Sequence, residues 1–301
     1  MKYLFNHQIN NWLDWIMVYR ELSEFLPMIK SIFRREKLEL EPYLGCMSGT
    51  HFVARFGNAV IKIYAPEESG NESGDSITEV LGLMHAEKHG VNISKLLAYG
   101  EIKDRYTFSY IITEYIDGIS YENAKKKMVP SQRYEMGRIV SSLCKRINIQ
   151  VDKFESVDMK KEAAENPRWS EWTESFNRER IRSYGEISNF QKIFVHGDLS
   201  ENNIILKDGI SYIIDFGECK AAPIQYEYAE IFRFDSDFLR GFFEEKSQDE
   251  IIDAAFYGLL LHDFGADILK NHMNIKTCDS LDELRRQIKN FLHCSKLQNG
   301  V

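Results

Sequence analysis

The residues best suited to chemistry lie in one short stretch of the sequence. Asp198 follows His196 by two positions, Asn203 comes five residues later, and an Asp-Phe-Gly triplet begins at Asp215. In phosphoryl transfer, one aspartate accepts the proton of an incoming hydroxyl, while an asparagine and a second aspartate hold Mg²⁺ against the nucleotide phosphates. We therefore predict that Asp198 is catalytic and that Asn203 and Asp215 are metal ligands.

Two apolar runs position these residues. Residues 204–206 and 212–214 are apolar or aromatic, and Asp208-Gly209 between them is typical of a tight hairpin turn. The pattern predicts two short buried strands, with Asn203 before the first strand and Asp215 after the second. We expect the hairpin to bring Asn203 and Asp215 side by side.

The Asp-Phe-Gly triplet occurs a second time, at residues 263–265. Residues 255–262 before it have the composition of a helix, and no pair of strands precedes them. We therefore predict that the second copy is a segment of a core helix and that only the first belongs to the site.

The chain resembles the aminoglycoside phosphotransferases, a branch of the protein-kinase-like superfamily, over about residues 40–265. His196-Gly197-Asp198-Leu199 matches the His-Gly-Asp-Leu of that family, and residues 223–229 are similar to its Pro-x-x-Tyr-Asp-Leu-Ala. Glu227 replaces the aspartate that braces the catalytic loop in the family. Residues 200–202 differ from the usual His-Pro-Gly and, together with residues 226–232, are more similar to the hygromycin phosphotransferases.

The resemblance implies an α+β, bilobal protein-kinase-like fold with a small β-rich nucleotide lobe and a larger, mostly helical lobe. We expect N-terminal helices and the nucleotide lobe in residues 1–117, and the catalytic and substrate lobe in residues 118–301. Residues 4–37 have helical spacing, with Pro27 separating or kinking two helices. The following patterns predict strands at 51–56, 59–64, 96–100 and 106–115, a helix at 76–88, and a charged, tryptophan-rich helical insertion over about 151–190 with Trp169 and Trp172 on one buried face.

Lys62 lies in the middle of a strand-like run, where alternation would normally place an apolar residue. The resemblance implies that it binds the α and β phosphates and that a carboxylate on the following helix holds it. Glu79 is the natural partner, and Glu87, near the helix end, is the alternative. A solvent-facing lysine on an edge strand is the competing interpretation.

Residues 44–50, ahead of Lys62, carry two glycines and two hydroxyl side chains. Glycines let backbone amides approach phosphate oxygens closely, so we predict that Ser48 and Gly49 bind the nucleotide, although an ordinary hairpin turn explains the same pattern. Residues 111–118 resemble the hinge of the superfamily. The resemblance implies that the carbonyl of Glu114 and the amide of Ile116 pair with the base, which leaves ATP and GTP undistinguished.

Acidic residues are concentrated after the catalytic hairpin. Residues 201–253 contain thirteen Asp or Glu and five Lys or Arg, and this difference of eight equals the net charge of the whole chain, −8. Such a surface attracts a cationic substrate. Glu230, Asp235 and Asp237 are the predicted acceptor contacts, and a solvated acidic face is the alternative.

Bulk composition narrows the class of protein further. A chain of 301 residues with 44% hydrophobic content can bury a full core, and its mildly negative charge suggests no nucleic-acid partner. The sequence shows no membrane span and no secretory leader, so a cytoplasmic protein, a monomer or weak dimer, is expected. The five cysteines have no spacing typical of a zinc site or a disulfide framework.

These observations favour a phosphotransferase that moves the γ-phosphoryl group of ATP or GTP, with Mg²⁺, to a hydroxyl of an aminoglycoside-like acceptor. A metabolic kinase of the same fold, acting on choline, a sugar or an amino alcohol, is the first alternative. A protein kinase is disfavoured because Gly197 replaces the usual arginine and no Ala-Pro-Glu element follows. A nucleotide-binding module without catalysis is disfavoured because Lys62, Asp198, Asn203 and Asp215 are all present.

Overall fold

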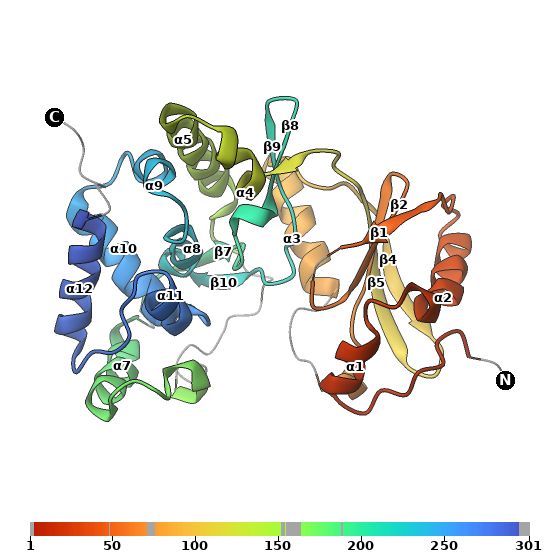
Figure 1. Cartoon of the computed structure of the whole chain (residues 1–301), viewed down its shortest axis with the longest axis horizontal. Coiled ribbons are helices and arrows are strands. Elements are labelled where there is room, and N and C mark those ends of the chain that lie inside the picture. The colour runs from red at the N-terminus through yellow and green to blue at the C-terminus, as the bar shows by residue number, and fades with distance from the viewer. Residues whose placement is uncertain are drawn as a thin grey trace. The chain divides into compact units, whose positions relative to one another are not determined.

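The structure is a computed structural model (Figure 1) that describes residues 3–47, 49–70, 76–151, 154, 164–187 and 189–294. The chain forms two compact units. Unit 1 contains the described residues within 1–88, 92–118 and 212–218, and unit 2 contains those within 89–91, 119–211 and 219–301. Residues 212–218, which carry the first Asp-Phe-Gly, therefore belong with the N-terminal unit although they lie far along the chain.

Unit 1 is built on a five-stranded antiparallel sheet with the strand order β1-β2-β3-β5-β4. The predicted strands and the helix at 76–88 are confirmed. The elements of this unit are α1 (Trp12–Val18), α2 (Leu22–Arg35), β1 (Tyr43–Cys46), β2 (Phe52–Phe56), β3 (Ala59–Ile63), η1 (Glu67–Ser69), α3 (Ser76–Lys88), β4 (Leu96–Lys103) and β5 (Thr107–Glu114).

The two faces of this sheet are covered by different helices. Ile61 and Ile63 of β3 pack into a large apolar core with residues of α1 and α2. Tyr64, directly after β3, clusters instead with Val80 of α3, and Figure 1 shows α2 and α3 on opposite sides of the sheet. Because side chains alternate along a strand, Lys62 projects from the face that α3 covers.

The N-terminal helices differ from the prediction. Asn11 caps α1 by accepting from the amides of Leu13 and Asp14, so helix begins only at Trp12. The break between α1 and α2 falls at residues 19–21, and Pro27 lies inside α2. Pro27 is the sixth residue of α2, so it cannot donate to the carbonyl of Ser23 and its ring crowds that carbonyl. The burial of the apolar face of α2 outweighs this cost.

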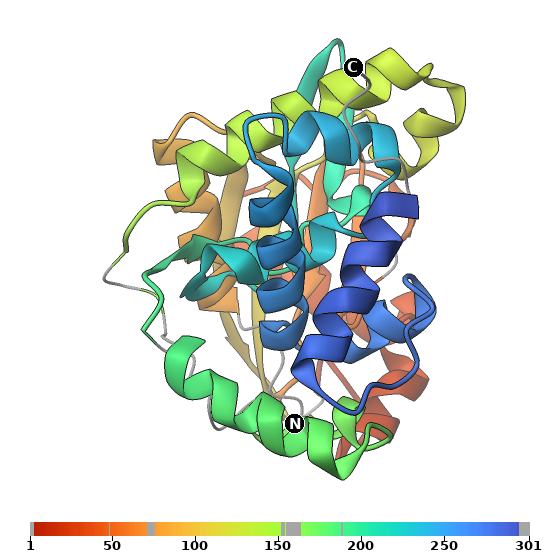
Figure 2. The ribbon, with the colours of Figure 1, turned by 90° about the vertical axis from the view of Figure 1, so that its left-hand side faces the viewer.

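Unit 2 is mostly helical, and Figure 2 shows α10 and α12 side by side within it. Helices α5 and α9 also pack together, as do α8 and α10. The elements are β6 (Ile119–Ser120), α4 (Tyr121–Ala124), η2 (Lys125–Lys127), α5 (Pro130–Ile147), η3 (Pro167–Trp169), α7 (Glu174–Ile187), β7 (Lys192–Val195), η4 (Glu201–Asn203), β8 (Ile204–Lys207), β9 (Ile210–Ile213, which ends in unit 1), β10 (Lys220–Pro223), α8 (Ile224–Ile231), α9 (Ser236–Phe242), α10 (Gln248–Leu261), α11 (Gly265–Asn271) and α12 (Leu281–Cys294).

The predicted catalytic hairpin is present. Strands β8 and β9 are neighbours in a three-stranded sheet of order β6-β8-β9. Asp208 and Gly209 between them both have positive φ, 51° and 77°, which is the backbone of a tight hairpin turn and explains the Asp-Gly pair. Asn203 directly precedes β8, and Asp215 comes two residues after β9. Their predicted proximity remains a prediction, because the two residues belong to different units.

The described part of the 151–190 segment is helical mainly in α7. Trp169 and Trp172 are buried, as predicted, and their ring centroids lie 5.0 Å apart. They do not share a helix face, however, because Trp169 ends η3 and Trp172 lies in the turn before α7. Both rings pack on Phe176 of α7, so a shared aromatic neighbour, and not a common helix face, brings the two tryptophans together.

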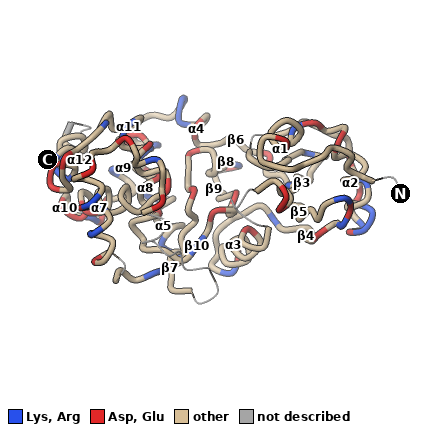
Figure 3. The backbone as a smooth tube through the Cα atoms, turned by 90° about the horizontal axis from the view of Figure 1, so that it is seen from below, with Lys and Arg blue, Asp and Glu red and all other residues tan. Residues whose placement is uncertain are grey.

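The helices carry charged residues of both signs. Figure 3 shows that Lys and Arg are mixed with Asp and Glu over the helices of unit 2. Throughout the described residues, every helix is too short or too polar to cross a membrane.

Candidate active site

Lys62 is the centre of a charged cluster in unit 1. Its Nζ lies 2.7 Å from Oε2 of Glu79 and 2.9 Å from Oδ1 of Asp215. Burial lowers the pKa of Lys62, but the two carboxylates outweigh burial and raise the pKa above its ordinary value. The ammonium is therefore charged at neutral pH and is held by two anions. Of the two partners considered from the sequence, the structure selects Glu79, while Glu87 is exposed.

The position of Glu79 follows from the packing of α3. Glu79 lies in the first turn of that helix, where the helix dipole stabilises a carboxylate. Val80, the next residue, anchors α3 to the sheet. Strand β3 directs Lys62 to the same face, so the ion pair forms from a strand residue and a helix residue seventeen positions apart.

Asp215 reaches Lys62 through an unusual backbone conformation. Its φ is 62°, in the left-handed region that aspartate and asparagine enter more readily than most residues. The Asp215 side chain is 48% exposed, whereas that of Glu79 is 9% exposed. Glu79 is therefore suited to holding the lysine, and Asp215 to meeting a ligand as well.

Tyr64 and His51, which were not predicted as site residues, belong to the same cluster. The Tyr64 hydroxyl donates to Oε2 of Glu79, and its ring lies 4.7 Å from that of His51. Nδ1 of His51 accepts from the amide of Ala65 at 3.1 Å, which leaves the proton of the neutral ring on Nε2. Burial, and then the charge of Lys62, lower the pKa of His51 to about 3. Only the alternation of Lys62 and Tyr64 gave a sequence signal for this arrangement.

The predicted phosphate loop is shorter than expected, because β1 takes in residues 44–46. Ser48 lies outside the described residues. Gly49 lies in the remaining turn before β2, and the Trp15 indole donates to the carbonyl of Thr50 at 2.9 Å. A contact from α1 thus fixes one end of this turn.

The predicted hinge follows the end of β5. The amide of Glu114 donates to the carbonyl of Lys95 at 2.8 Å, and that of Tyr115 to Asn58 at 2.7 Å. Within the described chain, the amide of Ile116 has no hydrogen-bond partner. It is thus a candidate donor to a base.

In unit 2, Asp198 and Asn203 form a linked pair. Nδ2 of Asn203 donates to the main-chain oxygen of Asp198 at 2.7 Å and to its Oδ2 at 3.0 Å. Because both amide hydrogens are directed to Asp198, Oδ1 of Asn203 is the atom left for a metal ion. The catalytic role of Asp198 and the metal-binding role of Asn203 remain predictions.

Glu227 of α8 holds the backbone ahead of Asp198. Its Oε2 accepts from the amides of His196 at 2.6 Å and Gly197 at 3.3 Å. Burial raises the pKa of Glu227 to about 7, although these amide bonds lower it. Its Oε1 is buried and has no partner among the described atoms. The glutamate makes the bracing contact that the resemblance implied for an aspartate at this position.

The first predicted acceptor contact, Glu230, is buried near the end of α8. Its carboxylate is 2% exposed and pairs with the half-exposed Arg233 at 2.7 Å. One cation therefore already compensates its charge from the solvent side.

The other two predicted acceptor contacts begin α9. Asp235 is the N-cap of that helix, accepts from the Tyr121 hydroxyl at 3.1 Å and pairs with Arg133. Asp237 pairs with Arg133 and Arg240. Both carboxylates support the local fold, so an additional role in acceptor binding remains a prediction.

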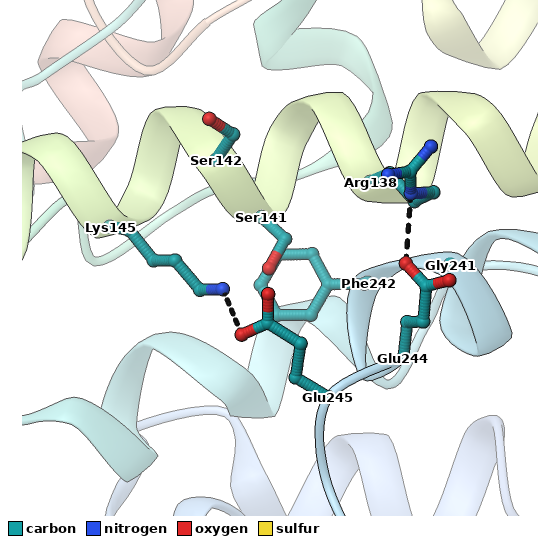
Figure 4. Close-up of a pocket in the computed structure, with 8 residues that line it drawn as sticks. All are labelled: Arg138, Ser141, Ser142, Lys145, Gly241, Phe242, Glu244 and Glu245. Atoms are coloured by element: carbon teal, nitrogen blue, oxygen red, sulfur yellow. Dashed lines mark hydrogen bonds and ion pairs between the residues drawn. The ribbon is translucent and has the colours of Figure 1, made fainter.

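A hollow between α5 and α9 is lined by charged residues (Figure 4), but it contains none of the predicted site residues. Arg138 pairs with Glu244 at 2.8 Å, and Lys145 pairs with Glu245. Because each cation that lines it has its own carboxylate, the hollow does not resemble a phosphate site.

Comparison with known proteins shows one matching family and several structures of similar fold. A family model described as "Phosphotransferase enzyme family" matches residues 52–260. A search of curated proteins found no significant match. The fold is that of a GDP complex of aminoglycoside 2'-phosphotransferase-IIIa (TM-score 0.60, 14% identity, 88% of this chain and 98% of that chain covered).

Two further solved structures share this fold. One is aminoglycoside phosphotransferase APH(4)-Ia (TM-score 0.56, 14% identity, 91% and 99% covered). The other is a choline/ethanolamine kinase family protein from Mesorhizobium loti (TM-score 0.54, 15% identity, 91% and 95% covered). The α+β, protein-kinase-like fold predicted from the sequence is thereby confirmed.

Proposed function

We propose that this chain, which belongs to the phosphotransferase enzyme family, moves the γ-phosphoryl group of ATP or GTP to a hydroxyl of a cationic, aminoglycoside-like small molecule. The Lys62 ammonium, held by Glu79 and Asp215, is the observation that carries the proposal. A cation that is only 17% exposed and has two anionic partners is a site prepared for phosphate oxygens.

The nucleotide would bind to unit 1. Lys62 would contact the α and β phosphates, and Glu79 would keep it in place. The amide of Ile116 and the carbonyl of Glu114 would receive the base, and Gly49 and Ser48 would lie along the phosphates. Main-chain groups would supply the base contacts, so the proposed donor is ATP or GTP.

The acceptor hydroxyl would be deprotonated by Asp198 of unit 2. As its oxygen bonds to the γ-phosphorus, the bond from that phosphorus to the bridging oxygen breaks, and the hydroxyl proton passes to the Asp198 carboxylate. Asn203 would orient this carboxylate through its bond to Oδ2. Glu227 would hold the preceding backbone in place.

Asp215 and Asn203 would hold Mg²⁺. Within the described residues, no three His, Cys, Asp or Glu side chains form a metal cluster by themselves. Such a sparse set fits Mg²⁺, which is commonly bound by one or two carboxylates together with substrate phosphates. Bound there, Mg²⁺ would neutralise charge on the transferred group.

Glu230, Asp235 and Asp237 would attract the cationic acceptor. Structures with this fold include a GDP and kanamycin complex of APH(2")-IIIa and a streptomycin-ATP-APH(2")-IIa ternary complex. Likeness to the choline/ethanolamine kinase family protein favours a second candidate acceptor class, amino alcohols. The nearer likeness to hygromycin phosphotransferases remains a prediction.

The test is a phosphorylation assay with Mg²⁺ and either ATP or GTP. Aminoglycosides, including hygromycin, would be compared with choline, ethanolamine and sugars, with mass spectrometry detecting the gain of one phosphoryl group. The Asp198→Asn variant is the control for contaminating kinases. We expect transfer to an aminoglycoside. Transfer only to choline or ethanolamine would favour the second candidate acceptor class. If neither an aminoglycoside nor an amino alcohol gained a phosphoryl group, both candidate classes would be rejected.

We further propose that the enzyme works in the cytoplasm, where both nucleotides are available, as a monomer or weak dimer. Neither a nucleic acid nor a membrane takes part in the proposed reaction. Light scattering of the purified protein at several concentrations tests the oligomeric state.

A further inference from the structure

His262 is a buried histidine at the end of α10, beside the second Asp-Phe-Gly. The helix ends at Leu261, and residues 263 and 264 form a turn before α11 begins at Gly265. The prediction that this triplet is a core helix segment is therefore wrong, and Phe264 is 46% exposed. The His262 backbone leaves the helical region, with ψ at 142°, which turns the chain and directs the imidazole inward.

The two ring nitrogens of His262 have different partners. Nδ1 accepts from the amide of Phe264 at 3.1 Å, so the proton of the neutral ring must be on Nε2. Nε2 lies 3.2 Å from the main-chain oxygen of Gly197, which can only accept. Burial lowers the pKa of His262, although Glu230 and Asp263 raise it. The residue is thus a neutral donor to the catalytic loop.

The bond from His262 acts on the peptide group that joins Gly197 to Asp198. The oxygen of this peptide accepts from His262, and its N–H, which belongs to Asp198, donates to Nδ1 of His196 at 3.3 Å. The peptide is therefore held at both ends by buried histidines. Gly197 has a φ of 83°, in the left-handed region that glycine adopts at less cost than other residues.

A second set of contacts fixes His262 itself. The ring of Tyr226 lies 4.5 Å from the His262 ring. The Tyr226 hydroxyl donates to Oδ2 of Asp263 at 2.8 Å, and Nζ of Lys220 donates to the same hydroxyl at 3.1 Å. Tyr226 precedes Glu227 on α8, so the two elements that hold the catalytic loop are also tied to each other.

We infer that His262 is a positioning residue for phosphoryl transfer: by donating from Nε2 to Gly197, it fixes the peptide plane that sets the direction of the Asp198 carboxylate. The inference rests on the proposed function of Asp198. Asp263 has the same place in the second Asp-Phe-Gly as Asp215 has in the first. Here its carboxylate holds Tyr226, whose ring packs on His262.

Two substitutions distinguish the hydrogen bond from His262 to Gly197 from the packing of the His262 side chain. In His262→Gln, the side-chain amide nitrogen can take the place of Nε2 and keep the bond. In His262→Asn, the shorter side chain can still accept from Phe264 but does not reach Gly197. His272→Asn, the same change just after α11, is the matched control.

Hydrogen exchange of peptides covering residues 196–204 is measured first, without substrate. We expect faster exchange in His262→Asn than in the wild type, and exchange close to wild type in His262→Gln and His272→Asn. In the phosphorylation assay, kcat of His262→Asn should fall by roughly 10- to 100-fold, with the nucleotide KM unchanged, and His262→Gln should recover most of it.

Wild-type exchange and kcat in His262→Asn would overturn the inference. Equal losses in the Asn and Gln variants, together with a lower Tm, would also overturn it, since they would show a residue that only fills space. If the wild-type protein phosphorylates none of the acceptors, the proposed function fails, and the exchange measurement still decides whether His262 holds the loop.

Discussion

Removing the charge of Glu79 tests the nucleotide site most directly. Glu79→Gln preserves the shape of the side chain and an acceptor for Tyr64 but replaces a charged bond of 2.7 Å to Lys62 with a neutral one. Hydrogen bonds to charged groups contribute about 1.5–3 kcal/mol. Breaking a buried pair costs about 3–5 kcal/mol when a charge is left alone, but Asp215 remains 2.9 Å from Lys62, so the smaller range applies.

This range corresponds to a loss of roughly 10- to 150-fold in affinity, at about 1.4 kcal/mol for each factor of ten. Calorimetry with ADP and Mg²⁺ measures the affinity, and kcat/KM for ATP should fall in parallel. Glu87→Gln is the matched control, because it makes the same change on the exposed side of the same helix. If Glu79→Gln bound ADP as tightly as the wild type, or if Glu87→Gln were equally impaired, the proposed role of the Lys62–Glu79 pair in nucleotide binding would be refuted.

Three further predictions concern unit 2. Asp198→Asn should lower kcat by roughly 10² to 10⁴ while ADP affinity measured by calorimetry stays unchanged; near-normal turnover would reject Asp198 as the base. Glu230→Gln, which removes no helix cap, should raise the KM of a polycationic acceptor and weaken its dependence on salt; an unchanged acceptor KM across ionic strength would assign Glu230 to the fold alone. Because burial raises the pKa of Glu227 to about 7, its ionisation opposes folding as pH rises from its unfolded pKa towards 7. Thermal unfolding should therefore show the Tm of the wild type falling relative to Glu227→Gln between pH 5 and pH 8, and a constant difference would contradict the raised pKa.

Local signals were sufficient to predict the elements that carry the site. The hairpin of β8 and β9 was predictable because the Asp208-Gly209 turn has its own backbone preference. The helix that carries Glu79 was predictable because a polar, glycine-bearing stretch precedes residue 76 and Gly90 follows residue 88. Pro27 misled the prediction of the helix break. Proline destabilises a helix locally, but burial of the apolar face of α2 in the core of unit 1 stabilises the helix by more than that.

The contacts that complete the site have no local signal. His51 reaches the Lys62 cluster because β2 and β3 pair in one register, and no spacing near His51 indicates this. The pattern of residues 223–229 pointed to Glu227, but the atoms it binds are backbone amides, which every sequence supplies. Likewise, Asp235 and Asp237 look like free carboxylates in the sequence, and only packing shows that Arg133 joins them.

The second Asp-Phe-Gly shows how the same three residues acquire different chemistry. Asp215 follows a strand, adopts a left-handed conformation and meets a lysine in unit 1. Asp263 follows a helix, and its carboxylate accepts from the Tyr226 hydroxyl. The difference lies in the element before each triplet, because the backbone continues in a different direction after a strand than after a helix. We therefore propose metal binding for the first copy, and for the second a contact with Tyr226 that supports the position of His262.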